Sequence, residues 1–520
     1  MKFSTLIDAC ACLWESGQVP HWNRGVDPEI TSVHSRSQNV GPGGLFIAVK
    51  GFKSDGHDFI PDALQRGAAA LVTLEPVTDA GNIPVVRVPD IRKAMSAIAA
   101  RFYGNPSKGL CLVGITGTNG KTTTSWILES IFQEAGYRTG VIGTVNWRYG
   151  GRTFTNPVTT PDAMDLQRML GEMKANQVSH VVMEVSSHGI DLHRVNDCCF
   201  DAAVFTNLTQ DHLDYHPDMD HYFGCKKQLF TRILTQGPKA GTAASVINVD
   251  HEKGRELAGA ITSRLITVSQ GPGAQVSCRN VKDEISGLGG TLVVADKAQP
   301  FQSHLTGGFN LENILCAAGA AHAVGISLIS IVKGIEGCTG VPGRLERVAP
   351  LSGRHIFVDY AHTPDALESI LATLKMRAPA RLISVFGCGG DRDRTKRPIM
   401  GKTGAWYSDL AIITSDNPRT EDPLAIIDQI KAGVITVPGR EYSARELDKG
   451  FSAKGFLVEP DRKKALETAV RVSMQGDIIV AAGKGHETYQ ILKTGTIEFD
   501  DRRVLETAAL ACIPKETIYG

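Results

Sequence analysis

Residues 110–124 read Leu110-Cys111-Leu112-Val113-Gly114-Ile115-Thr116-Gly117-Thr118-Asn119-Gly120-Lys121-Thr122-Thr123-Thr124. The apolar run at the start predicts a buried strand over 110–113, and residues 125–135 predict a helix after it. A glycine-rich turn between a strand and a helix directs backbone N–H groups and the positive helix end toward one point, which suits a phosphate group. Lys121 can reach the β- and γ-phosphates of a nucleotide, and Thr122 can offer its hydroxyl to Mg²⁺.

The glycine spacing of this turn departs from the usual GxxxxGK[ST] pattern, because Ile115 stands where the first glycine is expected. Gly117 supplies backbone freedom two residues later. We therefore expect ATP or GTP to bind here. The expected contacts are Gly117, Thr118, Asn119, Gly120, Lys121, Thr122 and Thr123. Kinases, switches, motors and ligases all use such loops, so the loop by itself identifies no reaction.

The chain has 520 residues, which corresponds to roughly three domains at about 150 residues each. Short apolar strands alternate with amphipathic helical segments along nearly its whole length, which is typical of the α/β class with parallel sheets. Turn signals at Gly104-Asn105-Pro106, after a predicted helix over 91–103, and at Val341-Pro342-Gly343 divide the chain. We expect an N-terminal α/β substrate domain over 1–106, a central P-loop ATPase-like sheet domain over 107–342 and a C-terminal Rossmann-like domain over 343–520.

The composition excludes several classes of protein. Lys and Arg total 55, as do Asp and Glu, and a chain with zero net charge has no basic footprint for nucleic acid. No apolar run reaches the ~18 residues of a membrane span, and Asp8 interrupts the N-terminal run where a signal peptide would be apolar. None of the 11 cysteines forms a CxxC pair, which disfavours a zinc cage and favours reduced thiols. We expect a cytoplasmic protein without a membrane or nucleic-acid partner.

Polar residues follow two further predicted strands of the central domain. Glu184 ends the strand 180–183, where a carboxylate would face the phosphate loop and hold Mg²⁺, unless it is only a solvated strand-end residue. His212 lies in the segment 211–216, which contains two acids and two histidines and fits either an ordinary polar loop or a metal site. Lys226, judged from its neighbours 221–227, is expected to be a solvated lysine on a helix.

Taken in order, these segments resemble the Mur ligase family, the ATP-dependent amino-acid ligases of peptidoglycan precursor synthesis. The resemblance covers essentially the whole chain. The matching motifs are 116–122, Glu184-Val185-Ser186-Ser187-His188, the segment 207–216, Gly308-Phe309-Asn310-Leu311-Glu312-Asn313, Gly343-Arg344-Leu345-Glu346 and Asp359-Tyr360-Ala361-His362-Thr363-Pro364. Four further segments are similar to the members that add diaminopimelate as the third residue of the peptide. They are His34-Ser35-Arg36, Asp55-Gly56-His57-Asp58-Phe59, Asp416-Asn417-Pro418-Arg419 and Gly483-Lys484-Gly485-His486-Glu487.

The resemblance implies a reaction in which a substrate carboxylate attacks the γ-phosphate of ATP. The resulting acyl phosphate is then captured by the amine of diaminopimelate. It also implies that Lys226 is carbamylated, which replaces a cation by an anion and reverses the interpretation given above. Thr122, Glu184 and His212 are then the other expected Mg²⁺ contacts, and Lys121 stabilises the transferring phosphoryl group.

The resemblance further implies where the two substrates bind. Asn248 matches an adenine-side contact. The positions that match the binding site of the UDP-muramyl dipeptide are Val33, Ser35, Phe52, Lys53, Ser54, Thr159, Thr160, Ser186 and Arg194. His34, Val158 and Leu192 depart from the family pattern, and the last two cannot make side-chain hydrogen bonds.

The amino-acid site provides the basis for specificity. Diaminopimelate differs from lysine by one distal carboxylate, and the planar guanidinium of Arg419 suits such a group. Lysine would leave that guanidinium without a partner, at a cost of ~2–4 kcal/mol. The other matching positions are Arg392, Asp416, Asn417, Pro418, Gly483 and Glu487. Without the resemblance to the family, the sequence Asp416-Asn417-Pro418-Arg419 would be interpreted as a structural turn.

Three alternatives remain open at this stage. One is a lysine-adding ligase of the same family, and another is a ligase similar to folylpolyglutamate synthetase, which lacks a uridine-binding first domain. The third is a nucleotide-dependent switch, which would need only the phosphate loop. The expected partners are therefore the small molecules ATP, Mg²⁺, the UDP-muramyl dipeptide and meso-diaminopimelate. We expect a monomer whose central and last domains close during catalysis.

Overall fold

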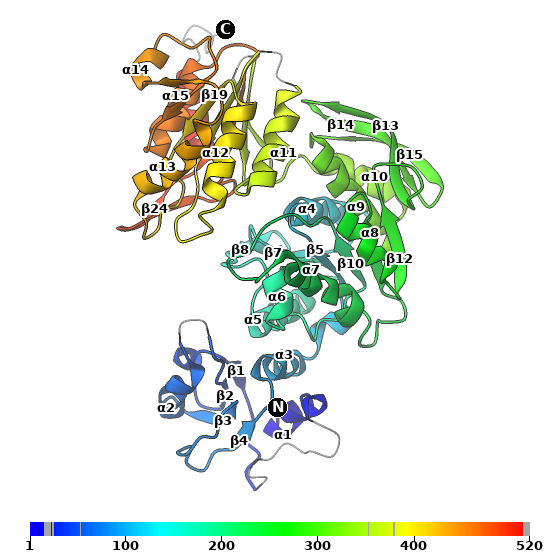
Figure 1. The fold of residues 1–520 in the computed structure, drawn as a ribbon. Coiled ribbons are helices and arrows are strands. Elements are labelled where there is room, and N and C mark those ends of the chain that lie inside the picture. Colours follow the sequence, from blue (N-terminus) through cyan, green and yellow to red (C-terminus); the bar gives the residue numbers. More distant parts are fainter. Residues whose placement is uncertain (15–21, 23–24, 52–53, 352, 378–379, 513–520) are drawn as a thin grey trace.

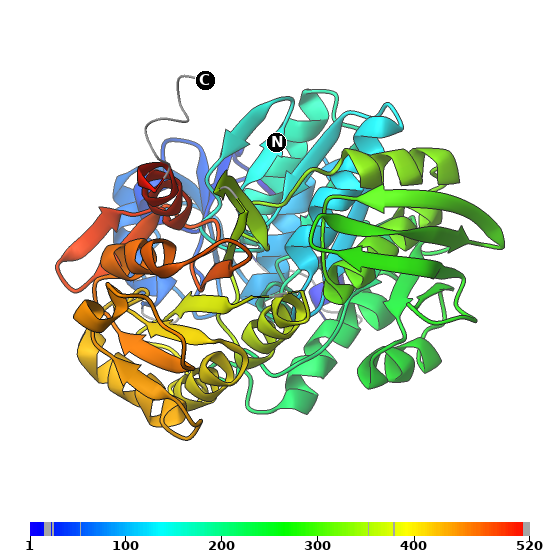
Figure 2. The same cartoon turned by 90° about the horizontal axis from the view of Figure 1, so that it is seen from above.

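The computed structural model describes residues 1–14, 22, 25–51, 54–351, 353–377 and 380–512. Three sheets follow one another along the chain, each with helices packed against it, and they lie in chain order from one end of the molecule to the other (Figure 1). The view from above in Figure 2 places the last domain beside the central one rather than over its centre. The predicted α/β class is confirmed.

The first sheet has four parallel strands in the order β1-β2-β3-β4. The elements of this region are α1 (Phe3–Asp8), β1 (Ser32–His34), β2 (Gly44–Ile47), α2 (Ile60–Gln65), β3 (Ala68–Thr73), β4 (Val85–Arg87) and α3 (Ile91–Phe102). The α3 helix matches the segment predicted from sequence, and Asp90 caps its N-terminus by accepting from the backbone N–H groups of Arg92 and Lys93.

The central sheet has eleven strands in the order β15-β14-β13-β12-β11-β10-β5-β9-β6-β7-β8. Its strands are β5 (Cys111–Thr116), β6 (Thr139–Ile142), β7 (Trp147–Tyr149), β8 (Arg152–Phe154), β9 (His180–Glu184), β10 (Ala202–Phe205), β11 (Ala244–Asn248), β12 (Arg264–Val268), β13 (Val276–Glu284), β14 (Gly287–Val294) and β15 (Lys297–Ser303). The run from β13 to β6 is parallel, and the pairings at both ends of the sheet are antiparallel.

Helices cover both faces of the central sheet. They are α4 (Lys121–Glu134), α5 (Ala163–Ala175), α6 (Ser187–Asp191), α7 (Met219–Gln228), α8 (Glu252–Gly259), α9 (Gly308–Ala323) and α10 (Leu328–Gly337). One buried core packs α4, α9 and α10 on one face, and a second packs α5, α7 and α8 on the other. The predicted helix after the phosphate loop begins at Lys121, four residues before the expected start.

The last sheet has seven strands in the order β16-β17-β22-β18-β19-β21-β20, all parallel except for β16. Its elements are β16 (Glu346–Leu351), β17 (Arg354–Asp359), α11 (Pro364–Lys375), β18 (Leu382–Phe386), α12 (Lys396–Tyr407), β19 (Leu410–Ile413), α13 (Pro423–Val434), β20 (Arg440–Tyr442), α14 (Ala444–Leu447), β21 (Gly455–Val458), α15 (Arg462–Val472), β22 (Ile478–Ala482) and α16 (Asp501–Ala511). A small hairpin of β23 (Tyr489–Leu492) and β24 (Gly495–Glu498) lies beside it.

Direct contacts join the three regions. Ala163 and Met164, at the start of α5, are buried in the same core as α3 of the first region. Arg347 of β16 donates to the carbonyl of Ile285 at 2.6 Å, and Arg377 forms an ion pair with Asp283. None of the helices in the described ranges is both long and apolar enough to cross a bilayer.

Candidate active site

The loop between β5 and α4 contains two positions that fit only glycine. Gly117 and Gly120 have φ values of 147° and 86°, which an L side chain rarely adopts. A Cβ atom at either position would also overlap a neighbour, Thr206 Oγ1 in one case and Asn313 Oδ1 in the other. Both positions therefore require glycine, and such a loop lets backbone N–H groups approach a phosphate closely.

Lys121 folds back over this loop. Its Nζ donates to the carbonyl oxygens of Gly117 at 2.9 Å and Thr118 at 2.8 Å. Burial lowers the pKa of the Lys121 ammonium, although the carboxylate of Glu184 opposes that shift. The amine thus lies where a nucleotide phosphate would offer it a stronger partner than two carbonyls.

Glu184 is placed at the loop by strand register. Ile115 of β5 pairs with Glu184 of β9, so the carboxylate lies at the C-terminal edge of the sheet beside the phosphate loop. Its Oε2 accepts from the hydroxyls of Thr122 at 3.1 Å and Thr144 at 2.8 Å, and its Oε1 accepts from the Thr144 N–H at 3.0 Å. With an exposed fraction of 1%, Glu184 is not the solvated strand-end residue that was the alternative.

Lys226 corrects the interpretation made from its neighbours alone. It lies on a helix as expected, but its exposed fraction is 1%, and its Nζ donates to the Gly117 carbonyl at 2.9 Å. Burial, followed by the nearby charge of Lys121, lowers the pKa of Lys226 well below its usual range. The physical reason is that α7 packs its lysine-bearing face under the phosphate loop, which local sequence does not reveal.

His212 lies in the loop between β10 and α7 with a φ of 55°. Its ring is 5.0 Å from that of His188 and 6.0 Å from that of Tyr222, measured between centroids. Burial lowers the pKa of His212, so its imidazole is favoured in the neutral form that can bind a cation.

Four of the residues expected to hold the UDP-substrate form one network beside Glu184. Thr160 Oγ1 donates to the Glu184 carbonyl at 2.9 Å and lies 3.1 Å from Ser186 Oγ, and Arg194 donates to the Thr160 carbonyl at 2.6 Å. Thr159 Oγ1 lies 3.0 Å from Thr144 Oγ1, which itself contacts Glu184. These side chains therefore gather at the edge of the sheet that carries the phosphate loop.

Val158 and Leu192, the two apolar residues that depart from the expected polar pattern, lie in different environments. Val158 is 45% exposed, whereas Leu192 is buried at the end of α6. Packing accounts for an apolar residue at 192, and nothing in the structure explains Val158.

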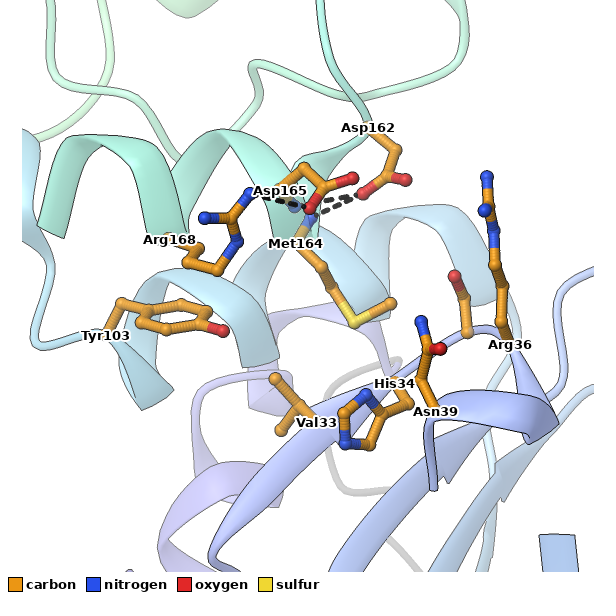
Figure 3. A pocket seen from close by; sticks show the side chains of 10 residues that line it. Val33, His34, Arg36, Asn39, Tyr103, Asp162, Met164, Asp165 and Arg168 are labelled. Carbon is orange, nitrogen blue, oxygen red and sulfur yellow. Dashed lines mark hydrogen bonds and ion pairs between the residues drawn. The ribbon is translucent and has the colours of Figure 1, made fainter. Parts of the chain in front are cut away.

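A cavity of about 270 Å³ lies between the first region and α5 (Figure 3). Val33 and Ser35, both expected at the uridine side, line it. Ser54 is exposed and is not among the residues that line the cavity, and Phe52 and Lys53 lie outside the described residues. Sequence reasoning did not single out the lining residues Asn39, Tyr103, Asp162, Asp165 and Arg168 as site residues. Three of them come from α5 and its cap, a contribution that only the packing of two regions reveals.

Asn248 ends β11 and is fully buried. Its Nδ2 donates to Glu312 Oε2 at 3.0 Å, and the same oxygen lies 2.9 Å from His251 Nε2. Glu312, on α9, thereby fixes two polar side chains at one strand end. This arrangement suits recognition of a polar ring such as a nucleobase.

The expected amino-acid site in the last region forms a second polar network. Asn417 Nδ2 donates to Glu487 Oε2 at 2.8 Å, and Lys484 Nζ donates to the same oxygen at 2.9 Å. Asp416 Oδ2 is buried and has no hydrogen-bond partner within the described chain, and the nearest cation is Arg462 at 4.0 Å. A Cβ at Gly483 would crowd that oxygen, so the glycine leaves room for a ligand beside it.

Arg419 adopts the left-handed conformation, with a φ of 54°. Its Nη1 donates to the Gly390 carbonyl at 2.7 Å, and no further bond of its guanidinium is formed within the described residues. Pro418 precedes it in a buried position, whereas Arg392 is exposed and, among the described residues, hydrogen-bonds only to the carbonyl of Asp391. Arg392 nevertheless lies close to Arg419, because a Cβ placed at Gly389 would be 2.9 Å from Arg419 Nη1 and 3.8 Å from Arg392 Cγ.

Arg344 is a functional candidate that the sequence prediction did not assign a role. Its Nη2 donates to Thr122 Oγ1 at 3.2 Å, across the junction between the central and last regions. Its guanidinium carbon lies 4.5 Å from the centre of the Tyr360 ring. Arg344 and Tyr360 both belong to motifs that carried the family resemblance. The sequence therefore pointed to these segments, but not to the contact of Arg344 with the phosphate loop.

Comparison with known proteins gives consistent matches along the chain. Family models match residues 29–103 ("Mur ligase family, catalytic domain"), 115–321 ("Mur ligase middle domain") and 343–485 ("Mur ligase, glutamate ligase domain"). A UDP-N-acetylmuramoyl-L-alanyl-D-glutamate–2,6-diaminopimelate ligase of Geobacter sulfurreducens is 48% identical over 474 residues, 91% of this chain and 93% of its own. A protein of the same name from Geobacillus thermodenitrificans is 40% identical over 508 residues, 98% of this chain and 99% of its own. A solved structure of a ligase with that name is 32% identical with a TM-score of 0.65, and the match covers 93% of this chain and 95% of that one.

Proposed function

Because the chain belongs to the Mur ligase family, we propose that it joins meso-diaminopimelate to the D-glutamate γ-carboxylate of UDP-N-acetylmuramoyl-L-alanyl-D-glutamate at the expense of ATP. In this proposal the substrate carboxylate attacks the γ-phosphorus of ATP, ADP leaves, and an acyl phosphate forms. The diaminopimelate amine then attacks the acyl carbon and releases inorganic phosphate, which leaves an amide. The product is a precursor of peptidoglycan.

One observation carries the proposal: Arg344 reaches Thr122 of the phosphate loop from the region that holds the amino-acid network. Two anions must meet when the carboxylate attacks ATP, and both Lys121 and Arg344 are cations beside the loop. Their positive charge opposes the repulsion and stabilises the charge that develops on the transferring group. A switch protein would have no need of the second network.

The residues at the loop also fit a magnesium ion. Glu184 and Thr122 offer a carboxylate and a hydroxyl oxygen within hydrogen-bond distance of each other, and hard oxygen ligands suit Mg²⁺. We propose that Glu184, Thr122, His212 and a modified Lys226 hold it. When bound, the ion would neutralise charge on the phosphates of ATP.

The environment of Lys226 favours a carbamate over an ammonium group. As an ammonium it would repel both Lys121 and a magnesium ion, and its lowered pKa favours the free amine. The amine nitrogen can attack the carbon of CO₂ and lose a proton, which gives a carbamate anion. We expect activity to fall in CO₂-depleted buffer and to return with bicarbonate, whereas a Lys226→Gln variant should be inactive and unresponsive. An enzyme indifferent to CO₂ whose intact mass shows no carbamate after trapping would refute the modification.

The last region supplies the specificity. The guanidinium of Arg419 would pair with the distal carboxylate of diaminopimelate, and the buried Oδ2 of Asp416, which has no partner among the described residues, suits an ammonium group. The expected UDP-substrate residues Thr159, Thr160, Ser186 and Arg194 form the network beside Glu184. The cavity lined by Val33 and Ser35 is the proposed uridine site.

Phosphate release tests the proposal. The purified protein should release phosphate from ATP only when the UDP-muramyl dipeptide and diaminopimelate are both present. A nucleotide switch would hydrolyse ATP without either compound, and an enzyme like folylpolyglutamate synthetase would respond to neither. Release with lysine at the same rate as with diaminopimelate would instead favour the lysine-adding alternative.

A further inference from the structure

Three side chains on and just before α7 bring nitrogen and sulfur donors together. One ring nitrogen each of His216 and His221 and the Sγ of Cys225 all lie within 4.8 Å of one another. His221 and Cys225 are four residues apart on α7 and so share one face of the helix, while His216 belongs to the preceding loop. None of these three side chains takes part in the ligase reaction proposed above.

The distances between these donors are close to those of a tetrahedral zinc site. With Zn–N bonds of about 2.0–2.1 Å and a Zn–S bond of about 2.3 Å, tetrahedral angles place two nitrogens about 3.3 Å apart and nitrogen and sulfur about 3.6 Å apart. The two imidazole Nδ1 atoms are 2.9 Å apart, and His221 Nδ1 is 3.8 Å from Cys225 Sγ. These two distances differ from the tetrahedral values by a few tenths of an ångström, and since the three donors lie within 4.8 Å of one another, His216 and Cys225 would draw closer on binding.

Asp191, at the end of α6, lies beside Cys225 and would move toward the two histidines to serve as a fourth ligand. Its Oδ1 is 3.5 Å from Cys225 Sγ, and its Oδ2 accepts from the Tyr215 hydroxyl at 2.6 Å. His216 Nε2 lies 2.9 Å from Ser187 Oγ, so a proton on Nε2 would leave the lone pair of Nδ1 directed at the cluster. Such outer partners orient metal ligands in proteins.

The environment allows a metal to enter and favours one chemical class. His216 and Cys225 are buried, whereas His221 is exposed and leaves a route from solvent. Two imidazoles, one thiolate and one carboxylate suit a borderline-soft tetrahedral cation such as Zn²⁺, and not Mg²⁺, which prefers octahedral oxygen ligands.

We propose that His216, His221, Cys225 and Asp191 form a second metal site, which binds Zn²⁺ or a similar divalent transition metal. The metal would tie α6, the loop 206–218 and α7 together. Lys226 directly follows Cys225, so the bound metal would fix the turn of α7 that directs Lys226 toward the phosphate loop. The site needs no nucleotide or UDP-substrate, and its test is independent of the proposed ligase function.

Cobalt provides the direct test, because Co²⁺ replaces Zn²⁺ and is coloured. Chelator-treated full-length protein titrated with Co²⁺ should bind one equivalent, with the intense visible bands of a tetrahedral site and a thiolate-to-cobalt charge-transfer band in the near ultraviolet. Zn²⁺ should abolish both signals, and a large excess of Mg²⁺ should not. Octahedral cobalt spectra without a charge-transfer band would overturn the proposal.

Variants locate the site. Cys225→Ala should remove the charge-transfer band, and His221→Ala, which changes an exposed side chain, should weaken Co²⁺ binding by more than about 100-fold. The exposed thiols Cys12 and Cys512 supply controls, so Cys12→Ser and Cys512→Ser should bind cobalt as the parent does. Zn²⁺ should raise the melting temperature of the parent but not of His221→Ala. Bands that survive in both cluster variants, or that disappear in the control variants, would place the metal elsewhere and refute the assignment.

Discussion

Lys121 and Lys226 meet at a single backbone carbonyl. Both Nζ atoms donate to the oxygen of Gly117 at 2.9 Å, and burial lowers the pKa of both lysines. Two ammonium groups so close would repel each other in a region poor in water. The free energy of the pair falls when one of them becomes neutral or anionic, which is the physical basis for assigning the carbamate to the more deeply buried Lys226.

Removing the Lys121 amine should affect the chemical step more than nucleotide binding. We expect Lys121→Ala to lower kcat by about 10²–10³-fold, because a donor aimed at developing charge is lost, while the KM for ATP rises less than tenfold. Steady-state phosphate release measures both constants. Lys333→Ala is the control, since Lys333 is 61% exposed on α10, and it should change neither constant. A raised KM with an unchanged kcat would mean that Lys121 only binds ATP.

Arg419 determines the choice of amino acid in this account. Arg419→Lys keeps the charge but loses the planar pair of donors. It should lower kcat/KM for diaminopimelate by about 30-fold or more, equivalent to ~2 kcal/mol, and narrow the preference over lysine. Initial rates with each amino acid give the ratio. Arg503→Lys, at a 73% exposed position of the same region, should leave the ratio as it is. An unaltered ratio in Arg419→Lys would show that another group recognises the carboxylate.

At the scale of elements, the phosphate loop depends on Gly120 for two reasons: its positive φ, and the lack of a Cβ atom that would overlap a neighbour. The chain offers a matched pair of sites, because Gly120 and Gly136 flank α4 with φ values of 86° and 85°. An alanine at either position would incur the same backbone cost of about 1–2 kcal/mol. Only at 120 would the new Cβ overlap another residue, Asn313, whereas nothing lies within 4 Å at 136.

Gly120→Ala should therefore weaken ATP binding by at least about tenfold, and Gly136→Ala should lower only the free energy of unfolding. Nucleotide titration and denaturant unfolding separate the two effects. Equal ATP affinity in the two variants would contradict the structural role of the loop.

The elements differ in how well the sequence predicts them. The helix 91–103 was predictable because the turn signal Gly104-Asn105-Pro106 marks its end, and the strand 180–183 because its apolar residues are buried. The start of α4 was predicted four residues late, since Lys121 and the threonines after it resemble loop residues until the glycine cap is known. The site divides in the same way: Glu184 was predictable as a strand-end carboxylate, whereas the burial of Lys226, the Arg344 contact and the contribution of α5 to the cavity depend on packing between distant segments.

At the scale of the whole molecule, the two reacting groups are held by different regions. The phosphate loop belongs to the central sheet and Arg419 to the last one, with Arg344 and the Arg377–Asp283 ion pair at their junction. Addition of a non-hydrolysable ATP analogue together with the UDP-muramyl dipeptide should make the molecule more compact. Small-angle scattering measures the radius of gyration, and its forward intensity should give the mass of a monomer. An unchanged radius with both ligands bound would argue against closure.

The central claim is that a carboxylate phosphorylated on the central sheet is captured by an amine whose far carboxylate is held by Arg419. The most direct measurement is the mass of the product formed from ATP, the UDP-muramyl dipeptide and equal amounts of lysine and diaminopimelate. We predict that nearly all of the product carries diaminopimelate. Equal incorporation of lysine would contradict the role of Arg419, and the absence of any amide product would contradict the proposed reaction as a whole.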